Sequence, residues 1–362
     1  MRTDKRQIQP GEAATPFTEF KLENAGQAEW QGGMKLSNAN GNVPDTSLAY
    51  QYTIQTTTAI RQDVIQQKFY EVPPADFMPV LVGLGAWMED IKTNLEFQAA
   101  GGFEGGYLST AQSPAQLDNV DVATAPVTAR IWTWAKSFRY SIPEINKALA
   151  YNNWNVIQAK MSALMKHAQL GLQKTLFLGN PTDLAGTPGL LSNETVTVNT
   201  AIITQAISSM TYTQFQTLIA DILEAYFLNS NNTVLPDSFA MPISDYLGLG
   251  GFVNPQFPLA DSTFLAVLEE TFRRMTGNAS FMVKGLLYGN QAANVGYWAT
   301  LGTNRYALYR NNPDTLKVDV PVPFTMNPAV PVGSINFEGS LMFQHTGAIF
   351  YRPAEALYLD WT

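Results

Sequence analysis

One long segment without regular periodicity restricts what this chain can fold into. From Leu95 to Arg130 the sequence is rich in glycine, alanine and proline, and no helix or strand period continues for more than about five residues. Connections longer than about 12 to 15 residues are uncommon inside compact domains. The segment also carries apolar side chains that a solvated linker would lack, namely Phe97, Phe103, Tyr107, Leu108, Leu117 and Val120. We therefore expect a neighbouring copy of the same chain to cover this loop.

The composition favours a large core and a surface that partners cover. The chain has 362 residues, of which 46% are hydrophobic, and this length is enough for about two or three domains. Only 14% are charged, whereas about 25% is usual in soluble domains. Asparagine, glutamine, threonine and serine supply the polarity instead, and these side chains enter an interface at a lower desolvation cost than ions.

Acidic residues dominate the charge, and they are concentrated in one segment. The net charge is -8, and residues 175–271 contain no lysine or arginine. The acidic residues of this segment are Asp183, Glu194, Asp221, Glu224, Asp237, Asp245, Asp261, Glu269 and Glu270. We interpret the segment as a solvated acidic face, with a surface that avoids nucleic acid as the alternative. The sequence has no basic stripe to grip a phosphate backbone, so sequence-specific binding of DNA is not expected.

The sequence lacks the features of secreted, disulfide-stabilised and membrane-spanning proteins. It contains no cysteine, which excludes disulfides and thiolate metal sites. Its N-terminal segment lacks the apolar core of a signal peptide, and no apolar stretch approaches the about 18 to 20 residues that a bilayer span needs. We therefore expect no membrane association and a protein that is made in the cytoplasm.

Apolar residues at spacings of three and four predict several helices. The predicted helices are a short one at 59–74, a tract opened by Pro143, a long helix at 155–178 ended by Gly179, a helix capped by Thr213, and one that starts at Asp261 or Ser262. Gln173 is expected on the outer face of the long helix, and Met275 on the inner face of the last one.

Alternating and β-branched stretches predict strands at 79–89, 131–142 and 196–207 and over much of the chain beyond Gly277. We predict that 131–142 is the return strand of the loop, so that the loop and its flanks form a two-stranded finger. Helices and strands are largely segregated along the chain, which predicts an α+β fold.

Residue types that carry catalysis or metal binding are sparse. His167 and His345 have no His, Asp or Glu at metal-ligand spacing in their own elements, so we interpret each as structural. Glycine clusters at 83–85 and 248–251 do not complete a dinucleotide-binding motif. We expect these glycines to relieve tight turns.

Carboxylate pairs and one aromatic set are the remaining candidates. The pairs Glu89/Asp90 and Asp118/Asp121 lack a third catalytic partner, so we interpret them as surface charges. An aromatic set alternates on one face of the predicted return strand: Trp132, Trp134, Phe138 and Tyr140. These rings could stack on sugars or bases, but cross-strand packing is favoured. The sequence thus predicts no catalytic, cofactor-binding or metal-binding residue, and no enzyme.

The order of these features resembles that of a known family. A polar N-terminal arm and a long extended loop are followed by a long helix, opened by SIPEINKALAY and closed by LFLGN, and by the turn LAGTPGLLSN. The sheet-rich remainder ends in YRPAEALYL. This order resembles the major capsid proteins of tailed phages with the Hong Kong 97-type fold, which encapsulin nanocompartments share. The segment Gly189 to Asn193 is similar to a recurrent Gly-Leu-Leu-Asn segment after the long helix of that family, with Ser192 intervening here.

The resemblance implies a division of the whole chain. It implies an N-terminal arm at 1–58, the first part of a peripheral domain at 59–94, an extended loop at 95–130, the rest of the peripheral domain with its spine helix at 131–194, an axial domain at 195–300, and C-terminal strands completing both domains at 301–362. It also implies contact with neighbouring copies through the arm and the loop. The candidate contact residues are Phe17, Phe20, Trp30, Phe97, Phe103, Tyr107, Leu108 and Leu117.

The resemblance implies a structural function in a virion. Copies of the chain would assemble in the host cytoplasm, as hexamers and pentamers, into an icosahedral head that encloses double-stranded DNA, with portal, scaffold and cement proteins as possible partners. Some members of the family link subunits through a loop lysine, but residues 91–129 contain only Lys92, near the loop base. Non-covalent interlocking is therefore expected. An encapsulin-like compartment and another structural virion component, such as a tail or baseplate protein, are the alternatives.

Overall fold

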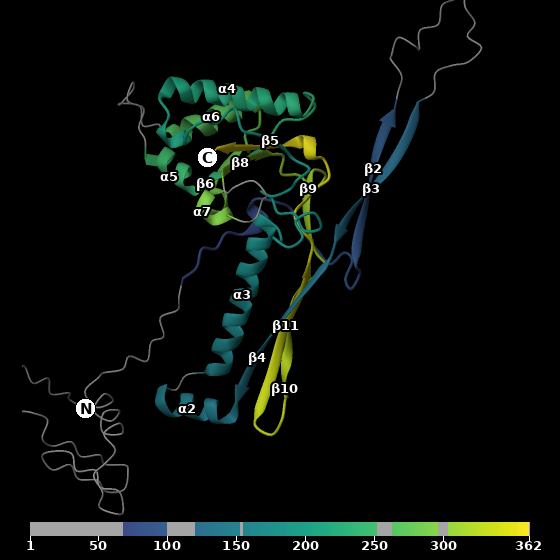
Figure 1. Ribbon diagram of the computed structural model, residues 1–362, viewed down its shortest axis with the longest axis vertical. Helices are drawn as coiled ribbons and strands as arrows, with labels where there is room; N and C mark the ends of the chain where they lie inside the picture. Colours follow the sequence, from purple (N-terminus) through teal and green to yellow (C-terminus); the bar gives the residue numbers. More distant parts are fainter. Residues whose placement is uncertain (1–67, 100–119, 153–154, 252–262, 296–302, 362) are drawn as a thin grey trace, which may run out of the picture. The chain divides into compact units, whose positions relative to one another are not determined.

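Four β-sheets and several helices form the part of the chain that the structure describes (Figure 1). The structure is a computed structural model, and it describes residues 68–99, 120–152, 155–251, 263–295 and 303–361. The predicted arm at 1–58 lies outside the described residues, as do residues 100–119 of the predicted loop. The combination of helices with separate sheets confirms the predicted α+β class.

The long helix α3 (Val156–Leu178) follows its apolar spacing. The side chain of Asn155 caps its start by accepting a hydrogen bond from the backbone N–H of Gln158 at 3.1 Å. Gly179 ends the helix with φ 78° and ψ -176°, a backbone conformation that favours glycine. The predicted helix at 155–178 and its glycine stop are therefore confirmed.

The surroundings of α3 are partly as predicted. Helix α2 (Ile142–Asn152) confirms the helical tract at Pro143. The prediction that Gln173 faces away from the core is wrong, because its side chain is buried and accepts a hydrogen bond from the backbone N–H of Val72 at 3.0 Å. It also donates to the Tyr288 hydroxyl at 3.0 Å. A glutamine fits this buried position because its amide supplies both a donor and an acceptor.

The turn after α3 fixes the helix end against the rest of the fold. A Cβ atom at Gly189 would lie 2.3 Å from the backbone nitrogen of Gly179, so only glycine fits there. The backbone N–H groups of Leu190 and Leu191 donate to carbonyl groups in the last turn of α3 at 2.8 and 2.9 Å. Both leucine side chains are buried. The Ser192 hydroxyl accepts from the N–H of Gly189 at 2.9 Å, which closes the turn.

A buried ion pair holds this turn to a neighbouring sheet. Arg305 donates to both carboxylate oxygens of Asp360, at 2.7 and 2.6 Å. Its remaining guanidinium nitrogen donates to the carbonyl of Leu191 at 2.6 Å. The two charged side chains are only 6% and 8% exposed. The guanidinium therefore serves as a three-way link between two strands and the turn.

The sheet in question has five strands in the order β5-β13-β8-β6-β7. These strands are β5 (Thr197–Asn199), β6 (Ser238–Pro242), β7 (Met282–Leu286), β8 (Asn304–Tyr309) and β13 (Ala356–Trp361). Both faces of its central strands are buried. Along β8, Tyr306 and Leu308 belong to one hydrophobic cluster, whereas Ala307 and Tyr309 belong to another. Such strands show a continuous apolar run in place of an alternating pattern.

Three helices contribute to one of these clusters. They are α4 (Tyr212–Asn229), α5 (Ile243–Gly251) and α6 (Phe264–Thr276). Helix α4 begins two residues earlier than predicted, because Thr211 and not Thr213 forms the capping box with Gln214. The predicted inward position of Met275 on α6 is wrong, since this side chain is 54% exposed.

Two further differences from prediction concern the same region. The predicted strand at 196–207 contains only the three-residue β5, followed by turns and the short helix η3 (Ile207–Ser209). Strand β6 and helix α5 were not predicted. The glycine cluster at 248–251 lies within α5 and does not relieve a turn, so that expectation is wrong.

A second sheet lies against α3, in the order β10-β11-β4. Its strands are β4 (Trp132–Ser141), β10 (Val322–Pro331) and β11 (Asn336–His345). The predicted cross-strand packing of the aromatic set is confirmed for two of its members. The ring centroids of Trp134 and Phe343 are 5.2 Å apart, and those of Tyr140 and Phe337 are 5.3 Å apart.

The predicted two-stranded finger exists, but with a different return strand. Strand β2 (Asp90–Ala99) pairs in antiparallel register with β3 (Asp121–Arg130), from Asp90 opposite Arg130 to Ala99 opposite Asp121. The prediction that 131–142 returns along the loop is wrong, because β4 pairs with β11. Regular strands thus extend into the segment that lacks sequence periodicity, because most positions of β3 have no buried side that would impose alternation.

The remaining elements are short. A three-stranded sheet contains β1 (Val80–Val82) parallel to β9 (Leu316–Val320), with β12 (Ile349–Phe350) on the other side of β9. The short helices are η1 (Pro74–Asp76), η4 (Leu287–Gly289), α7 (Gln291–Asn294) and η5 (Pro353–Glu355). The predicted helix at 59–74 lies mostly outside the described residues, and its described part is irregular before η1.

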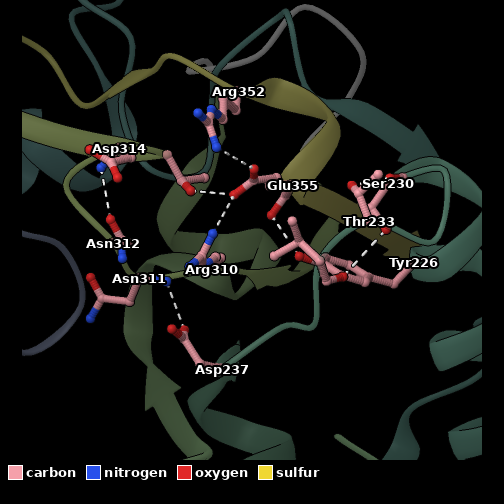
Figure 2. A network of polar contacts seen from close by, with 12 residues as sticks. Tyr226, Ser230, Thr233, Asp237, Arg310, Asn311, Asn312, Asp314, Arg352 and Glu355 are labelled. Atoms are coloured by element: carbon pink, nitrogen blue, oxygen red, sulfur yellow. Dashed lines mark hydrogen bonds and ion pairs between the residues drawn. The ribbon is translucent and has the colours of Figure 1, made fainter.

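A buried carboxylate links elements of two sheets (Figure 2). Glu355 lies in η5, immediately before β13, and accepts a hydrogen bond from the Thr315 hydroxyl just ahead of β9. It also forms an ion pair with Arg352 at 3.3 Å, and its backbone carbonyl accepts from the Tyr226 hydroxyl of α4 at 3.0 Å. The network therefore fixes the start of β13 relative to both β9 and α4.

The end of β11 buries a titratable ring. His345 is buried, its ring lies 5.6 Å from that of Phe343, and its Nδ1 lies 3.1 Å from the Thr346 carbonyl oxygen. Burial lowers the pKa of His345 below its ordinary value of 6.5, and the hydrogen bond to Thr346 only partly opposes this. The folded protein therefore keeps this ring neutral at pH values where the unfolded chain binds a proton.

Replacement of Gly189 by alanine tests the turn after α3. We expect Gly189→Ala to lower the free energy of unfolding by at least about 2 kcal/mol, because the added methyl group collides with backbone that cannot move freely. Gly171→Ala is the control, since Gly171 lies within α3 and a Cβ there meets nothing within 4 Å. This variant should gain about 0.5 to 1 kcal/mol. Urea unfolding measures both, and equal effects would contradict the proposed close contact.

The buried ring of His345 predicts a pH dependence of stability. The contribution of the neutral His345 ring to the free energy of unfolding is complete above the unfolded-state pKa of 6.5. It is lost as the pH falls below that value, because the unfolded chain then binds a proton that the buried ring does not. Between pH 7.5 and 5.5, we expect His345→Gln to reduce the loss of unfolding free energy by up to about 1.4 kcal/mol. The unmodified protein, unfolded over the same pH range, is the reference. A pH dependence of stability equal to that of the unmodified protein would refute this assignment.

Candidate functional site

The β2–β3 ribbon is anchored at one end and exposed along the rest. At its base, Ile91 and Ala129 pack against Ile131, Ile349 and Tyr351 in a small buried cluster. Farther along the strands, Phe97 is 54% exposed and Val122 is 51% exposed. The ribbon thus has a fixed root and an apolar outer part.

Neither strand of the ribbon has a second partner among the described residues. Strands β2 and β3 form a sheet of two strands, and they run side by side in Figure 1. Each strand therefore presents one edge of unpaired backbone N–H and C=O groups. An arrangement of this kind can bind another polypeptide by strand pairing and by apolar contact.

The structure describes one of the predicted contact residues. Phe97 is on the exposed part of β2. The others, Phe103, Tyr107, Leu108 and Leu117 in the loop and Phe17, Phe20 and Trp30 in the arm, lie outside the described residues. Their part in subunit contact stays a prediction.

A second exposed apolar surface was missed by sequence reasoning. It lies at the end of β1 and in the turn between β1 and β2, where Val82, Leu84, Trp87 and Met88 are 62% to 64% exposed. The run of apolar residues at 79–89 predicts a strand or a strand pair, but only β1 is a strand. The glycines at 83 and 85, with φ 99° and 80°, confirm the predicted tight turns and are the one sequence signal for this feature.

A third exposed set lies where the β10–β11 connection meets α2. Val330, Val332 and Ile335 are 56%, 44% and 49% exposed. Ile142, at the start of α2, is 42% exposed, and its backbone N–H donates to the carbonyl of Ile335 at 3.1 Å. Three separate parts of the fold therefore present apolar side chains to solvent.

The chemistry-bearing residues do not converge. Within the described ranges, no group of three or more His, Cys, Asp or Glu side chains is placed to hold a metal ion. His167 lies 3.2 Å from the ammonium group of Lys136 on the exposed side of α3, far along the chain from the buried His345. Glu89, Asp90 and Asp121 are exposed, as surface charges should be, and Asp118 lies outside the described residues.

The acidic segment at 175–271 is only partly a solvated face. Asp221 and Glu224 are exposed on α4. Asp245 is buried, however, and accepts hydrogen bonds from the Ser208 hydroxyl at 2.8 Å, from the backbone N–H of Ile207 at 3.2 Å and from the Tyr306 hydroxyl. Its carboxylate is a structural acceptor in the core, because buried polar groups require partners.

Solved structures share this fold. The capsid of Myoviridae phage XM1 matches with a TM-score of 0.70 and 15% identity, over 85% of this chain and 98% of that chain. A structure from Mycobacterium phage Ogopogo matches with a TM-score of 0.51 and 15% identity, over 89% of this chain and 100% of that chain. The capsid of cyanophage P-SCSP1u matches with a TM-score of 0.50 and 13% identity, over 84% and 92%. The expected Hong Kong 97-type capsid fold is therefore confirmed.

Family membership follows from the sequence itself. A search of curated proteins finds no match. In the described ranges, no helix has the length and apolar character needed to cross a membrane. The sequence profile of the family described as "Major capsid protein" matches residues 109–361, which is more than half of the chain. This chain therefore belongs to the major capsid protein family.

Proposed function

We propose that this protein builds the icosahedral head of a tailed bacteriophage and that the head encloses double-stranded DNA. Copies of the chain interlock through non-covalent contacts into hexamers and pentamers. The observation that carries the proposal is the β2–β3 ribbon, which is rooted in its own subunit by Ile91 and Ala129 but leaves Phe97 and Val122 uncovered. A neighbouring copy is the natural cover in a protein of a capsid family.

The ribbon supplies two kinds of contact at once. Its unpaired strand edges offer backbone hydrogen bonds, and its apolar side chains offer burial. At about 25 cal/mol per Å², a contact that buries on the order of 1,000 Å² of apolar surface per copy contributes roughly 25 kcal/mol before the cost of association is subtracted. Repetition of such a contact around a closed shell stabilises the shell without any covalent link.

The proposal includes a division of the chain into an arm, a loop and two domains. We assign residues 1–58 to an arm, 59–94 and 131–194 to a peripheral domain, and 95–130 to the extended loop. Residues 195–300 form the axial domain in this assignment, and residues 301–362 complete both domains. The apolar residues of the arm and of the loop, from Phe17 to Leu117, are assigned to contacts with neighbouring copies.

The charge distribution is compatible with a DNA container. Residues 175–271 contain no lysine or arginine, and the exposed Asp221 and Glu224 lie on α4. A wall that bound duplex DNA strongly would oppose packaging and release, because each phosphate contact adds to affinity. Enclosure of DNA without sequence-specific binding requires no basic groove.

The loop chemistry favours non-covalent assembly. Residues 91–129 contain one lysine, Lys92, and it lies on β2 near the base of the ribbon. A linkage through a lysine at the loop tip is therefore not part of the proposal. Cement proteins, a scaffold and a portal are the partners that fit such a head, which is assembled in the host cytoplasm.

The proposal is tested by imaging the purified full-length protein. Closed shells with fivefold and sixfold clusters are expected in negative-stain micrographs. After assembly during infection or co-expression with the packaging components, nuclease treatment should leave protected double-stranded DNA. Open rings or fibres would contradict a head, and shells that hold protein in place of DNA would identify a compartment.

Substitution of Phe97 tests the role of the ribbon in assembly. We expect Phe97→Asp to leave the melting temperature unchanged, because the side chain is 54% exposed. The concentration needed for shell formation should rise at least about tenfold, since a charge replaces an aromatic contact. Gln98→Asp adds a charge at the adjacent exposed position and is the control. If both variants assemble like the unmodified protein, the ribbon does not carry the contact.

A further inference from the structure

The end of β1 and the turn between β1 and β2 form an exposed apolar surface. Its members Val82, Leu84, Trp87 and Met88, called here the Trp87 patch, lie within seven residues of one another, and each is 62% to 64% exposed. Single exposed apolar residues are common on protein surfaces, but a run of large apolar residues that includes a tryptophan is characteristic of an interaction site.

The backbone of this turn is held in an uncommon conformation. Trp87 has φ 65°, a left-handed value that bulky side chains rarely adopt. Its N–H donates to the side-chain oxygen of Gln344 at 3.0 Å, and the Gln344 amide donates to the Thr133 hydroxyl at 2.8 Å. Gln344 is only 3% exposed, so this support is part of the protein core. The fold therefore maintains a strained tryptophan whose side chain points largely to solvent.

Both ends of the turn are fixed as well. The N–H of Gly83 donates to the carbonyl of Val320 at 3.1 Å, and the N–H of Ile131 donates to the carbonyl of Glu89 at 2.8 Å. A rigid turn loses little conformational freedom on binding, which favours affinity for a given area. A rigid backbone that carries an exposed tryptophan indicates a contact surface, because a turn with a purely structural role does not need such a side chain.

We propose that the Trp87 patch is a contact surface for a second copy of this chain, distinct from the outer part of the ribbon. The inference rests on the proposed shell function. Burying the patch removes on the order of 400 Å² from solvent, whereas a stable pairwise interface needs about 800 Å² per partner. The patch alone is therefore too small for a free dimer, but it suffices as one contact among several in a lattice of copies.

The position of the patch supports the same occupant. The turn leads directly into β2, and Glu89 at its end is hydrogen-bonded to Ile131 in the cluster at the ribbon base. A neighbouring copy that covers the ribbon can thus continue onto the patch without a break. Trp87 is the anchor of this contact, because a large aromatic side chain on a rigid backbone contributes most of the energy of a small interface.

Replacement of Trp87 by glycine separates an interface role from a folding role. Glycine adopts the left-handed conformation without strain, so Trp87→Gly should leave the melting temperature of the free subunit equal or higher. The protein concentration that Trp87→Gly requires for shell assembly should rise at least about tenfold. Trp87→Phe keeps an aromatic side chain, so most of this increase should be absent in that variant. Asn232→Gly is the matched control, because Asn232 is exposed with φ 57° and glycine takes up the same left-handed backbone there without removal of an apolar side chain.

The unmodified protein gives an independent measurement. Hydroxyl-radical labelling read by mass spectrometry should modify Trp87 in free subunits and several-fold less in assembled shells. Equal labelling in both states, or assembly of Trp87→Gly at the same concentration as the unmodified protein, would overturn the inference while leaving the shell function intact. Absence of shells from the unmodified protein would instead contradict the proposed function.

Discussion

The close approach of Gly189 to Gly179 determines how the long helix meets the rest of the fold. Without side chains at these two positions, the backbone after α3 returns directly onto the last helical turn, and Leu190 and Leu191 pair with its carbonyl groups. Arg305 then joins the same turn to Asp360 of the five-stranded sheet. Helix and sheet are therefore held by backbone contact and a buried ion pair, so the orientation of α3 is set at its end and not only along its packed face.

Two regimes of burial follow from this arrangement. The central strands of the five-stranded sheet are buried on both faces, as the alternating membership of Tyr306 and Ala307 in two clusters shows. The β2–β3 ribbon is buried only at its root, and Phe97 and Val122 remain exposed. Among the described residues, one sheet is completed within the chain and another is left largely uncovered. This arrangement is suited to assembly, because a second molecule can supply the missing burial.

The sequence predicts those parts of the fold whose burial repeats with a regular period. The helices α3 and α4 present apolar stripes at helical spacing, so their existence and type are correct, whereas the cap of α4 and the buried position of Gln173 on α3 were not predicted. The β3 strand was hidden because an exposed ribbon has no buried face to impose alternation, and its Pro126 argues locally against a strand. Strand β4 has the alternation of a half-buried strand, but periodicity identifies a buried face and not the partner strand, so its pairing with β11 required the tertiary structure.

The same reasoning explains what the sequence reveals of the contact surfaces. Phe97 was found because it lies in a segment without helix or strand periodicity that carries more apolar side chains than a solvated linker would. Trp87 was missed because the run that contains Val82 and Leu84 predicts a strand. The structure shows that Gly83 and Gly85 turn the chain, so that these side chains face solvent. Exposure of an apolar run is a tertiary property, since it depends on what the rest of the chain fails to cover.

Assembly of such subunits depends on a balance between short-range burial and longer-range repulsion. The net charge of -8 makes free copies repel one another, but at physiological ionic strength this repulsion is screened beyond about 8 Å. Apolar contacts act only when surfaces touch, and each exposed set in this fold is small. Several such contacts must therefore form together before the gain exceeds the cost of association, which favours closed assemblies with many neighbours over isolated pairs and keeps free subunits in solution until enough copies are present.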